Sequence, residues 1–147
     1  MAYWYLRPAT EQDIDFIYDL RIKTMKSYFE GTIGWKAGDQ YKFASDYLAE
    51  ASIICYEKKM IGVMKVLKHN DYIELHQIQI LPEHQNNGIG KALIQSVITS
   101  SDNCNLPIKL MVLKNSPARR LYENLGFKTT KVFKYNQEMT RLSSEIL

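Results

Sequence analysis

The fold of this chain is organised around one stretch, Ile80-Leu81-Pro82-Glu83-His84-Gln85-Asn86-Asn87-Gly88-Ile89-Gly90-Lys91-Ala92-Leu93. This stretch is typical of the end of a strand, a tight loop with no side chain at Gly88 and Gly90, and the first turn of a helix. Such a loop exposes backbone N–H groups at a helix N-terminus, where they can bind phosphate or pyrophosphate. The stretch therefore predicts an anion site between a strand and a helix.

Length and composition indicate an ordinary globular protein with a single domain, residues 1–147. No apolar run approaches the ~18 residues of a membrane helix, and residues 1–8 lack the pattern of a signal peptide. We therefore expect a cytoplasmic protein without a membrane partner. The net charge is only +3, and the Lys and Arg residues are scattered along the chain. This distribution argues against nucleic acid as the main partner and is compatible with an anionic small molecule.

Cysteine and histidine spacing predicts no metal site. Cys55 and Cys104 have no metal-type spacing, and we expect both to be reduced and structural. His69, His76 and His84 have no ligand-type partners at matching spacing.

Hydrophobic periodicity along the chain predicts a mixed α/β (α+β) fold in the order β-α-α-β-β-β-α-β-α-β. This order gives a mostly antiparallel central sheet with helices on both faces, in which one right-handed crossover leads to a parallel strand. We expect a polar tail after residue 135. The predicted strands are 3–7, 52–56, 60–67, 72–81, 108–113 and 127–135, and the last of these is either one strand or a pair of strands. The predicted helices are 10–28, 39–50, 87–101 and 115–125, and Gly126 is expected to end the last helix as a left-handed C-cap.

The strand predicted over 72–81 contains a break in its alternation. Ile73 and Leu75 place the apolar face on odd positions, whereas Ile78 and Ile80 place it on even positions. One extra residue near His76-Gln77, a β-bulge, would explain the change and would splay the strand from a neighbour. A strand buried on both faces would give the same pattern.

Two common phosphate-binding patterns do not match the glycine loop. A P-loop requires glycine where Gln85 stands and Ser or Thr where Ala92 stands. The dinucleotide fingerprint requires a small residue at the position of Leu93.

The segment 85–90, Gln-Asn-Asn-Gly-Ile-Gly, resembles the acyl-CoA motif of the GCN5-related N-acetyltransferase (GNAT) superfamily, which is Gln or Arg, two residues, Gly, one residue, then Gly or Ala. The segment 115–127, Asn-Ser-Pro-Ala-Arg-Arg-Leu-Tyr-Glu-Asn-Leu-Gly-Phe, resembles the Asn-x-x-Ala-x-x-x-Tyr-x-x-x-Gly-Phe segment of the same family. One helix and one strand separate the two segments, as in the family. The resemblance covers about residues 3–135 and implies a GNAT fold.

The resemblance implies acetyl-CoA as cosubstrate, with pyrophosphate on the loop backbone and the pantetheine arm paired like an extra strand. The backbone N–H near Ile78 would donate to the thioester carbonyl. Lys91 either adds charge toward phosphate or is a solvated helix residue, and Asn115 contacts the arm, caps its helix, or does both. The residues assigned to the cofactor are Ile78, Ile80, Gln85, Asn86, Asn87, Gly88, Ile89, Gly90, Lys91, Asn115 and Tyr122.

Three residues are candidates for the chemistry. Tyr122 matches the family tyrosine that protonates the departing thiolate, although its apolar helix face also suits core packing. Glu74 lies 11 residues before Gln85, where histone acetyltransferases of this family carry their glutamate base, and a solvent-facing strand charge is the alternative. His76 is the second candidate base because its ordinary pKa is near neutrality. A water chain to a base would serve as well.

Acceptor specificity is expected from the two N-terminal helices and the C-terminal strands. Tyr28, Glu30, Trp35 and Tyr135 lie there, and aromatic walls with one acid suit a cationic amine, although surface packing would explain them equally.

The sequence thus predicts acetyl transfer from acetyl-CoA to a primary amine of a small molecule or a protein, by direct attack in a ternary complex. A non-catalytic acyl-CoA-binding module on the same fold is the alternative, and it would need neither Glu74 nor Tyr122. The acceptor, the use of other acyl groups and the oligomeric state stay open, although dimers are common in the family.

Overall fold

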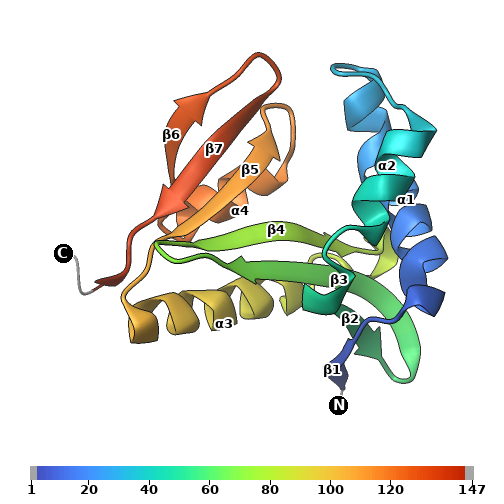
Figure 1. The fold of residues 1–147 in the computed structure, drawn as a ribbon, viewed down its shortest axis with the longest axis horizontal. Coiled ribbons are helices and arrows are strands. Elements are labelled where there is room, and N and C mark those ends of the chain that lie inside the picture. Colours follow the sequence, from blue (N-terminus) through green and yellow to red (C-terminus); the bar gives the residue numbers. More distant parts are fainter. Residues whose placement is uncertain (1–2, 145–147) are drawn as a thin grey trace. The chain divides into compact units, whose positions relative to one another are not determined.

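The computed structural model describes residues 3–144, which form an α/β fold with one seven-stranded mixed sheet. The strands are hydrogen-bonded in the order β1-β2-β3-β4-β5-β7-β6, and the predicted mixed fold class is confirmed (Figure 1). The pairs β1–β2, β2–β3, β5–β7 and β6–β7 are antiparallel, whereas β4 and β5 are parallel.

The observed elements follow the predicted order with one addition at the C-terminus. Short 3-10 turns at 11–13, 48–50 and 82–84 precede α1, β2 and the glycine loop. The strands are β1 Trp4–Pro8, β2 Ala51–Tyr56, β3 Lys59–Lys68, β4 Ile73–Ile80, β5 Ile108–Leu113, β6 Lys128–Val132 and β7 Asn136–Arg141. The helices are α1 Ile14–Glu30, α2 Ala37–Ser45, α3 Ile89–Cys104 and α4 Ala118–Asn124.

The chain forms two compact units, each built from two segments. Unit 1 comprises the chain up to Val66 together with Gln77–Gly90, and unit 2 comprises Leu67–His76 together with the chain from Lys91 onward. The prediction that residues 1–147 form a single domain stays a prediction.

In unit 1, helices α1 and α2 cover one face of the β2–β3 hairpin. Apolar side chains from all four elements form one buried cluster: Ile17, Leu20, Ala44, Ala51, Ile53, Cys55 and Val63. Cys55 and Cys104 are both free, as predicted.

Arg21 of α1 donates to Gln40 Oε1 of α2 from Nε (3.1 Å) and Nη2 (2.6 Å), and its guanidinium lies 4.0 Å from the centre of the Phe43 ring. This buried arginine therefore ties the two helices together.

The second helix is shorter than predicted, and a buried lysine explains where it ends. The prediction of one helix over 39–50 is wrong after Ser45, because Tyr47 has the left-handed φ of 56°. Lys65 of β3 is fully buried, and its ammonium donates to the carbonyls of Phe43 (3.0 Å), Ala44 (3.1 Å) and Asp46 (2.6 Å). The carbonyls lie in the last turn of α2 and just beyond it, where the helix offers few N–H donors, and the Phe43 carbonyl also accepts the Asp46 N–H (3.3 Å). Lys65 therefore caps this end of the helix.

Unit 2 contains a strand that the sequence did not reveal. Residues 136–141 were predicted as part of a polar tail, but they form β7, which lies between β5 and β6 (Figure 1). Its alternation is hidden because Gln137, at 6% exposure, shares the buried face with Met139. A polar residue in the core thus removed the hydrophobic pattern on which the prediction depended.

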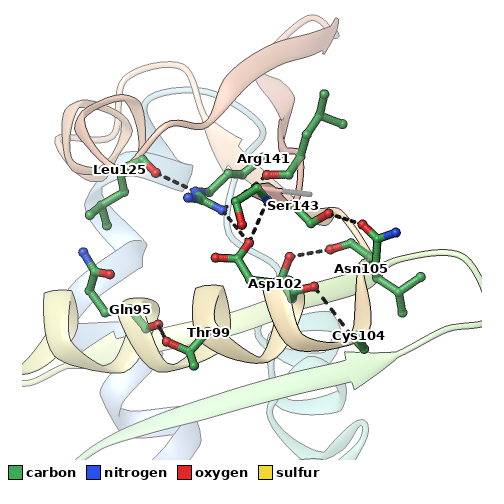
Figure 2. Close-up of polar contacts among 12 residues, drawn as sticks. Gln95, Thr99, Asp102, Cys104, Asn105, Leu125, Arg141 and Ser143 are labelled. Carbon is green, nitrogen blue, oxygen red and sulfur yellow. Dashed lines mark hydrogen bonds and ion pairs between the residues drawn. The ribbon is translucent and has the colours of Figure 1, made fainter. Parts of the chain in front are cut away.

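The end of β7 fixes the ends of two helices in unit 2 (Figure 2). Arg141 Nε donates to the Leu125 carbonyl at the end of α4 (2.9 Å), and Arg141 Nη1 lies 3.5 Å from Asp102 Oδ1 of α3. Ser143 Oγ donates to Asn105 Oδ1 (2.6 Å). Gly126, with a φ of 96°, ends α4 in the left-handed conformation that was predicted.

We predict that Lys65→Met destabilises the protein by about 2–4 kcal/mol at pH 7, because methionine fills the same space but leaves three carbonyls without their charged donor. Burial lowers the pKa of Lys65 to about 8. The folded protein therefore binds fewer protons than the unfolded chain from about pH 8 to the ordinary lysine pKa of about 10.4, so wild-type stability should rise across this window.

Urea denaturation between pH 7 and 10 measures both effects, and the variant should lack the rise. Lys42→Met is the matched control, since Lys42 is exposed on α2 and pairs only with Asp46 at the surface. If Lys65→Met were as stable as Lys42→Met, the capping role of Lys65 would be wrong.

Candidate active site

The glycine loop in unit 1 is anchored to the strand that precedes it. After the 3-10 turn 82–84, Gln85 Nε2 donates to the carbonyl of Ile80, the last residue of β4, at 2.8 Å. Asn86 (φ 62°) and Gly88 (φ 87°) are both left-handed, which turns the chain sharply before α3. The Gln85 side chain, which the sequence assigned to the cofactor site, therefore contacts the strand directly.

The helix after this loop begins at Ile89, two residues later than predicted. Asn87 Oδ1 accepts from the Ile89 N–H (3.4 Å), and the Ile89 side chain is buried. A Cβ on Gly90 would meet only Ile80 Cδ1, at 3.5 Å. Residues 85–88 are exposed, so this end of α3 presents backbone N–H groups to solvent without a side chain at Gly88 or Gly90. Lys91, which belongs to unit 2, is exposed.

The predicted change of phase in β4 is present, but it lies later than the sequence indicated. Ile73, Leu75 and Gln77 are buried at intervals of two, and the next buried residue is Ile80, three positions on. The change therefore falls at Ile78–Gln79 and not at His76-Gln77. Gln77 misled the prediction because it is a polar residue at a core position, where it is 3% exposed and donates to Gln79 Oε1 (2.6 Å).

Gly62 of β3 makes room for this irregular part of β4. A Cβ at Gly62 would lie 2.5 Å from the Gln79 carbonyl oxygen and 3.3 Å from the Ile80 Cα, so only glycine allows this approach. The Leu81 N–H also donates to the Ile61 carbonyl at 2.8 Å. Ile78, the predicted oxyanion donor, is half-buried at the change of phase.

In unit 2, Glu74 lies between two histidines. Glu74 Oε2 is 2.7 Å from His76 Nδ1, and Glu74 Oε1 is 2.9 Å from His69 Nε2. The sequence offered Glu74 and His76 as alternative bases, whereas the structure joins them in one network and adds His69. The turn before β4 brings His69 there, since its N–H donates to the Tyr72 carbonyl (2.9 Å). An imidazole just before a two-residue turn was the signal that sequence reasoning missed.

The environment of Glu74 favours its ionised form. Burial alone would raise the pKa of this carboxyl, but hydrogen bonds from His76 and His69 outweigh burial and hold the pKa below its ordinary value. Glu74 is therefore a carboxylate at neutral pH, with both oxygens oriented by imidazoles. The His69 ring is itself stacked on Tyr72, with 4.4 Å between ring centres.

Glu74 opens onto a cavity of about 340 Å³ within unit 2. The other residues that line it come from the turn before β4 and from β5, β6 and β7: Tyr72, Lys109, Leu110, Met111, Lys131 and Glu138.

The second sequence motif forms the start and body of α4. Ser116 Oγ accepts from the Ala118 N–H (3.2 Å), so the capping role lies with Ser116, while the Asn115 side chain is exposed and has no hydrogen-bond partner within residues 3–144. Tyr122 is 8% exposed and packs edge-on against Phe127, with 5.7 Å between ring centres. Burial raises the pKa of Tyr122 to about 12, so the phenol stays protonated.

The four residues predicted for acceptor binding occupy different settings. Tyr28 and Glu30 lie in the last turn of α1, and Glu30 is exposed. Trp35 contacts Phe29 (5.7 Å between ring centres) and Tyr18 (6.5 Å), so it belongs to an aromatic cluster of unit 1. Tyr135 belongs to unit 2, and the Lys134 ammonium lies 5.1 Å from the centre of its ring. Trp35 is therefore a packing residue of unit 1.

No group of His, Cys, Asp or Glu side chains among the described residues is arranged to hold a metal ion. No helix within residues 3–144 has the length and apolar character to cross a membrane.

Residues 40–141 match the family model described as the acetyltransferase (GNAT) domain, which is more than half of the chain. The chain belongs to the GNAT family. Its fold agrees, since PaiA N-acetyltransferase from Thermoplasma acidophilum, solved with coenzyme A, superposes with a TM-score of 0.75 at 14% identity, covering 95% of this chain and 99% of that one.

Other relatives of this GNAT chain differ in size. N-acetylglutamate synthase from Neisseria gonorrhoeae, solved with coenzyme A and N-acetyl-glutamate, has a TM-score of 0.69 at 15% identity, and the match covers 97% of this chain and 35% of that one. The UPF0157 protein YqkA of Bacillus subtilis is 30% identical over 79 residues, which are 54% of this chain and 23% of that protein. The matched region is thus less than a quarter of YqkA.

Gly62→Ala is predicted to destabilise the GNAT domain by about 3 kcal/mol, because the new methyl group meets the backbone of β4, which cannot move aside. Gly38→Ala in α2 is the control, since a Cβ there meets nothing within 4 Å and should be neutral or slightly stabilising. Equilibrium denaturation of both variants makes the comparison. Equal stability would show that β3 and β4 do not approach as closely as the structure indicates.

Proposed function

We propose that this chain is an N-acetyltransferase that moves the acetyl group of acetyl-CoA directly to a primary amine in a ternary complex. The observation that carries the proposal is the ionised Glu74, held by His69 and His76 at the edge of an open cavity, in a chain of the GNAT family. A module that only binds acyl-CoA would need neither an oriented carboxylate nor a cavity beside it.

Acetyl-CoA is the cosubstrate in this proposal. The exposed backbone N–H groups of residues 87–91 bind the pyrophosphate, and Gly88 and Gly90 leave room for its close approach. Lys91 adds positive charge, Asn115 contacts the pantetheine arm, and the Ile78 N–H donates to the thioester carbonyl as negative charge develops there. The anchored loop and the exposed Asn115 side chain support these assignments, as do family members solved with coenzyme A.

Glu74 acts as the base that frees the acceptor. An amine with the lysine-like pKa of about 10.4 is neutral in roughly 1 molecule in 2,500 at pH 7, a cost of about 4.6 kcal/mol. Glu74 takes one proton from the acceptor, the freed amine nitrogen attacks the thioester carbon, and Glu74 releases its proton to water in the open cavity. The second proton on the nitrogen is lost to water as the tetrahedral intermediate collapses. A C–N bond forms, the C–S bond breaks, and the electron pair leaves with the CoA sulfur.

Tyr122 assists the leaving sulfur as a hydrogen-bond donor. Its pKa of about 12 is about 3.5 pH units above the ordinary thiol value of about 8.5, so complete proton transfer to the thiolate would cost about 5 kcal/mol. A hydrogen bond from the phenol stabilises the thiolate without that cost, and water supplies the proton afterwards. Tyr28, Glu30, Trp35 and Tyr135 remain our proposed contacts for the rest of the acceptor.

Gly90→Glu is predicted to abolish acetyl-CoA binding. The space beside Gly90 admits a Cβ, so the variant should fold, but its carboxylate would repel the pyrophosphate. Acetyl-CoA should raise the melting temperature of the wild type, ATP and NAD should not, and the variant should show no shift. Gly90→Gln separates bulk from charge and should retain more affinity than Gly90→Glu. No shift with wild type would rule out the ligand, and unchanged affinity in Gly90→Glu would remove the loop from the site.

Glu74→Gln is predicted to lower kcat/KM at pH 7 by about 10²–10³-fold, because the amide cannot accept the proton. The deficit should shrink above pH 9, where more of the acceptor is already neutral, so the pH–rate profile should move to higher pH. CoA release measured from pH 6 to 10 tests this, with Glu57→Gln in the exposed β2–β3 turn as control. An unmoved profile would assign the base to His76 or to water.

A further inference from the structure

Strand register places four charged side chains on one face of the sheet in unit 2. Glu74 of β4 is the register partner of Lys109 on β5. Glu138 of β7 is the register partner of Met111 on β5 and of Lys131 on β6. All of these residues line the 340 Å³ cavity, so two carboxylates and two ammonium groups surround one space. A cavity of this size is at the lower end of the range for small-molecule sites.

The carboxylates and the ammonium groups of this cavity are not equally engaged. Glu74 is bonded to two imidazoles, and Glu138 Oε1 accepts from Thr130 Oγ1 at 2.7 Å. By contrast, neither lysine ammonium has an ion pair or a hydrogen-bond acceptor within the described chain. Lys109 Nζ instead lies 5.1 Å from the centre of the Tyr72 ring. The cavity therefore holds positive charge that is available to a ligand.

We propose that the acceptor is a zwitterion, a small molecule that carries a primary amine and a carboxylate. Its amine faces Glu74, and its carboxylate is bound by Lys131 and Lys109. This inference rests on the proposed transferase function and deepens it by naming the chemical class of the acceptor. A carboxylate on the ligand neutralises the ammonium groups that no protein group neutralises, and the amine is directed to the carboxylate that deprotonates it.

Charge also discriminates against other amines of equal length. An amine with a neutral group at its far end leaves the ammonium groups of Lys109 and Lys131 without an acceptor. A diamine carries a second ammonium that these lysines repel, and only Glu138, which is already bonded to Thr130, offsets that repulsion. We therefore expect the enzyme to prefer an acceptor whose far end is anionic over one whose far end is neutral, and a neutral far end over a cationic one.

The test compares 5-aminopentanoate, 5-aminopentan-1-ol and 1,5-diaminopentane, which share a chain length and a primary amine. With the full chain and acetyl-CoA, kcat/KM for the amino acid should exceed that for the alcohol by about 10- to 100-fold, and the diamine should be slowest. Homologues from three to six carbons locate the best spacing between the two charges.

Variants of one lysine assign the preference to the cavity. Lys131→Gln should narrow the preference for the amino acid over the alcohol, because only Lys109 then remains, and Lys131→Glu should favour the diamine. Lys128→Glu is the control, because Lys128 lies on the same strand, makes the same change in net charge and does not line the cavity.

Two outcomes with active enzyme would overturn the inference alone. Equal rates for the three acceptors would remove the zwitterion while leaving acetyl transfer intact. A preference of the wild type for the diamine would assign recognition to Glu138. If none of the three acceptors is acetylated, NMR titration of the protein with 5-aminopentanoate tests the zwitterion site alone. Binding that Lys131→Glu weakens would support the zwitterion site and count against the transferase function. No binding would overturn the zwitterion site.

Discussion

The close approach of Gly62 to the Gln79 carbonyl is the constraint on which the end of β4 and the glycine loop after it depend. This approach accommodates the change of phase in β4, where the buried residues Gln77 and Ile80 are three positions apart and not two. The buried side chains therefore lie at odd positions in the first half of the strand and at an even position at its end. The first half carries Glu74, and the second half ends at Ile80, whose carbonyl anchors the glycine loop through Gln85. A regular strand would keep one phase to its end and would aim Ile80 and the loop that follows it differently.

Buried polar groups determine several features that apolar packing alone would not. Lys65 has lost its hydration and must find acceptors, and it finds them at the carbonyls where α2 ends. Gln77 and Gln137 take core positions in β4 and β7, where Gln77 Nε2 donates to Gln79 Oε1 and Gln137 Nε2 donates to Thr129 Oγ1. Lys65 in particular makes local structure depend on distant partners, because its hydrogen bonds join β3 to residues about twenty positions earlier in the chain.

The chemistry of the proposed site follows from one carboxylate with three kinds of neighbour. Two imidazoles orient Glu74 and keep it ionised, and an open cavity gives it access to a small ligand. Lysine ammonium groups across that cavity provide a complement for negative charge. In the proposed mechanism, the same carboxylate serves both proton transfer and the orientation of the acceptor, because a zwitterion held at its anionic end would present its amine to Glu74.

Sequence alone determined the features that are encoded locally. The order of helices and strands, the Gly126 helix end and the family motifs follow from periodicity, backbone preference and fixed spacing between neighbours in the chain. Tertiary structure decided what depends on residues far apart: Lys65 ended α2 at Ser45, and the polar core positions Gln77 and Gln137 shifted the phase change of β4 and hid β7. The cavity likewise exists only because register brings Glu74, Lys109, Glu138 and Lys131 onto one face. No local pattern records the pairing of β4 with β5 or of β5 with β7, since these strands lie far apart in sequence.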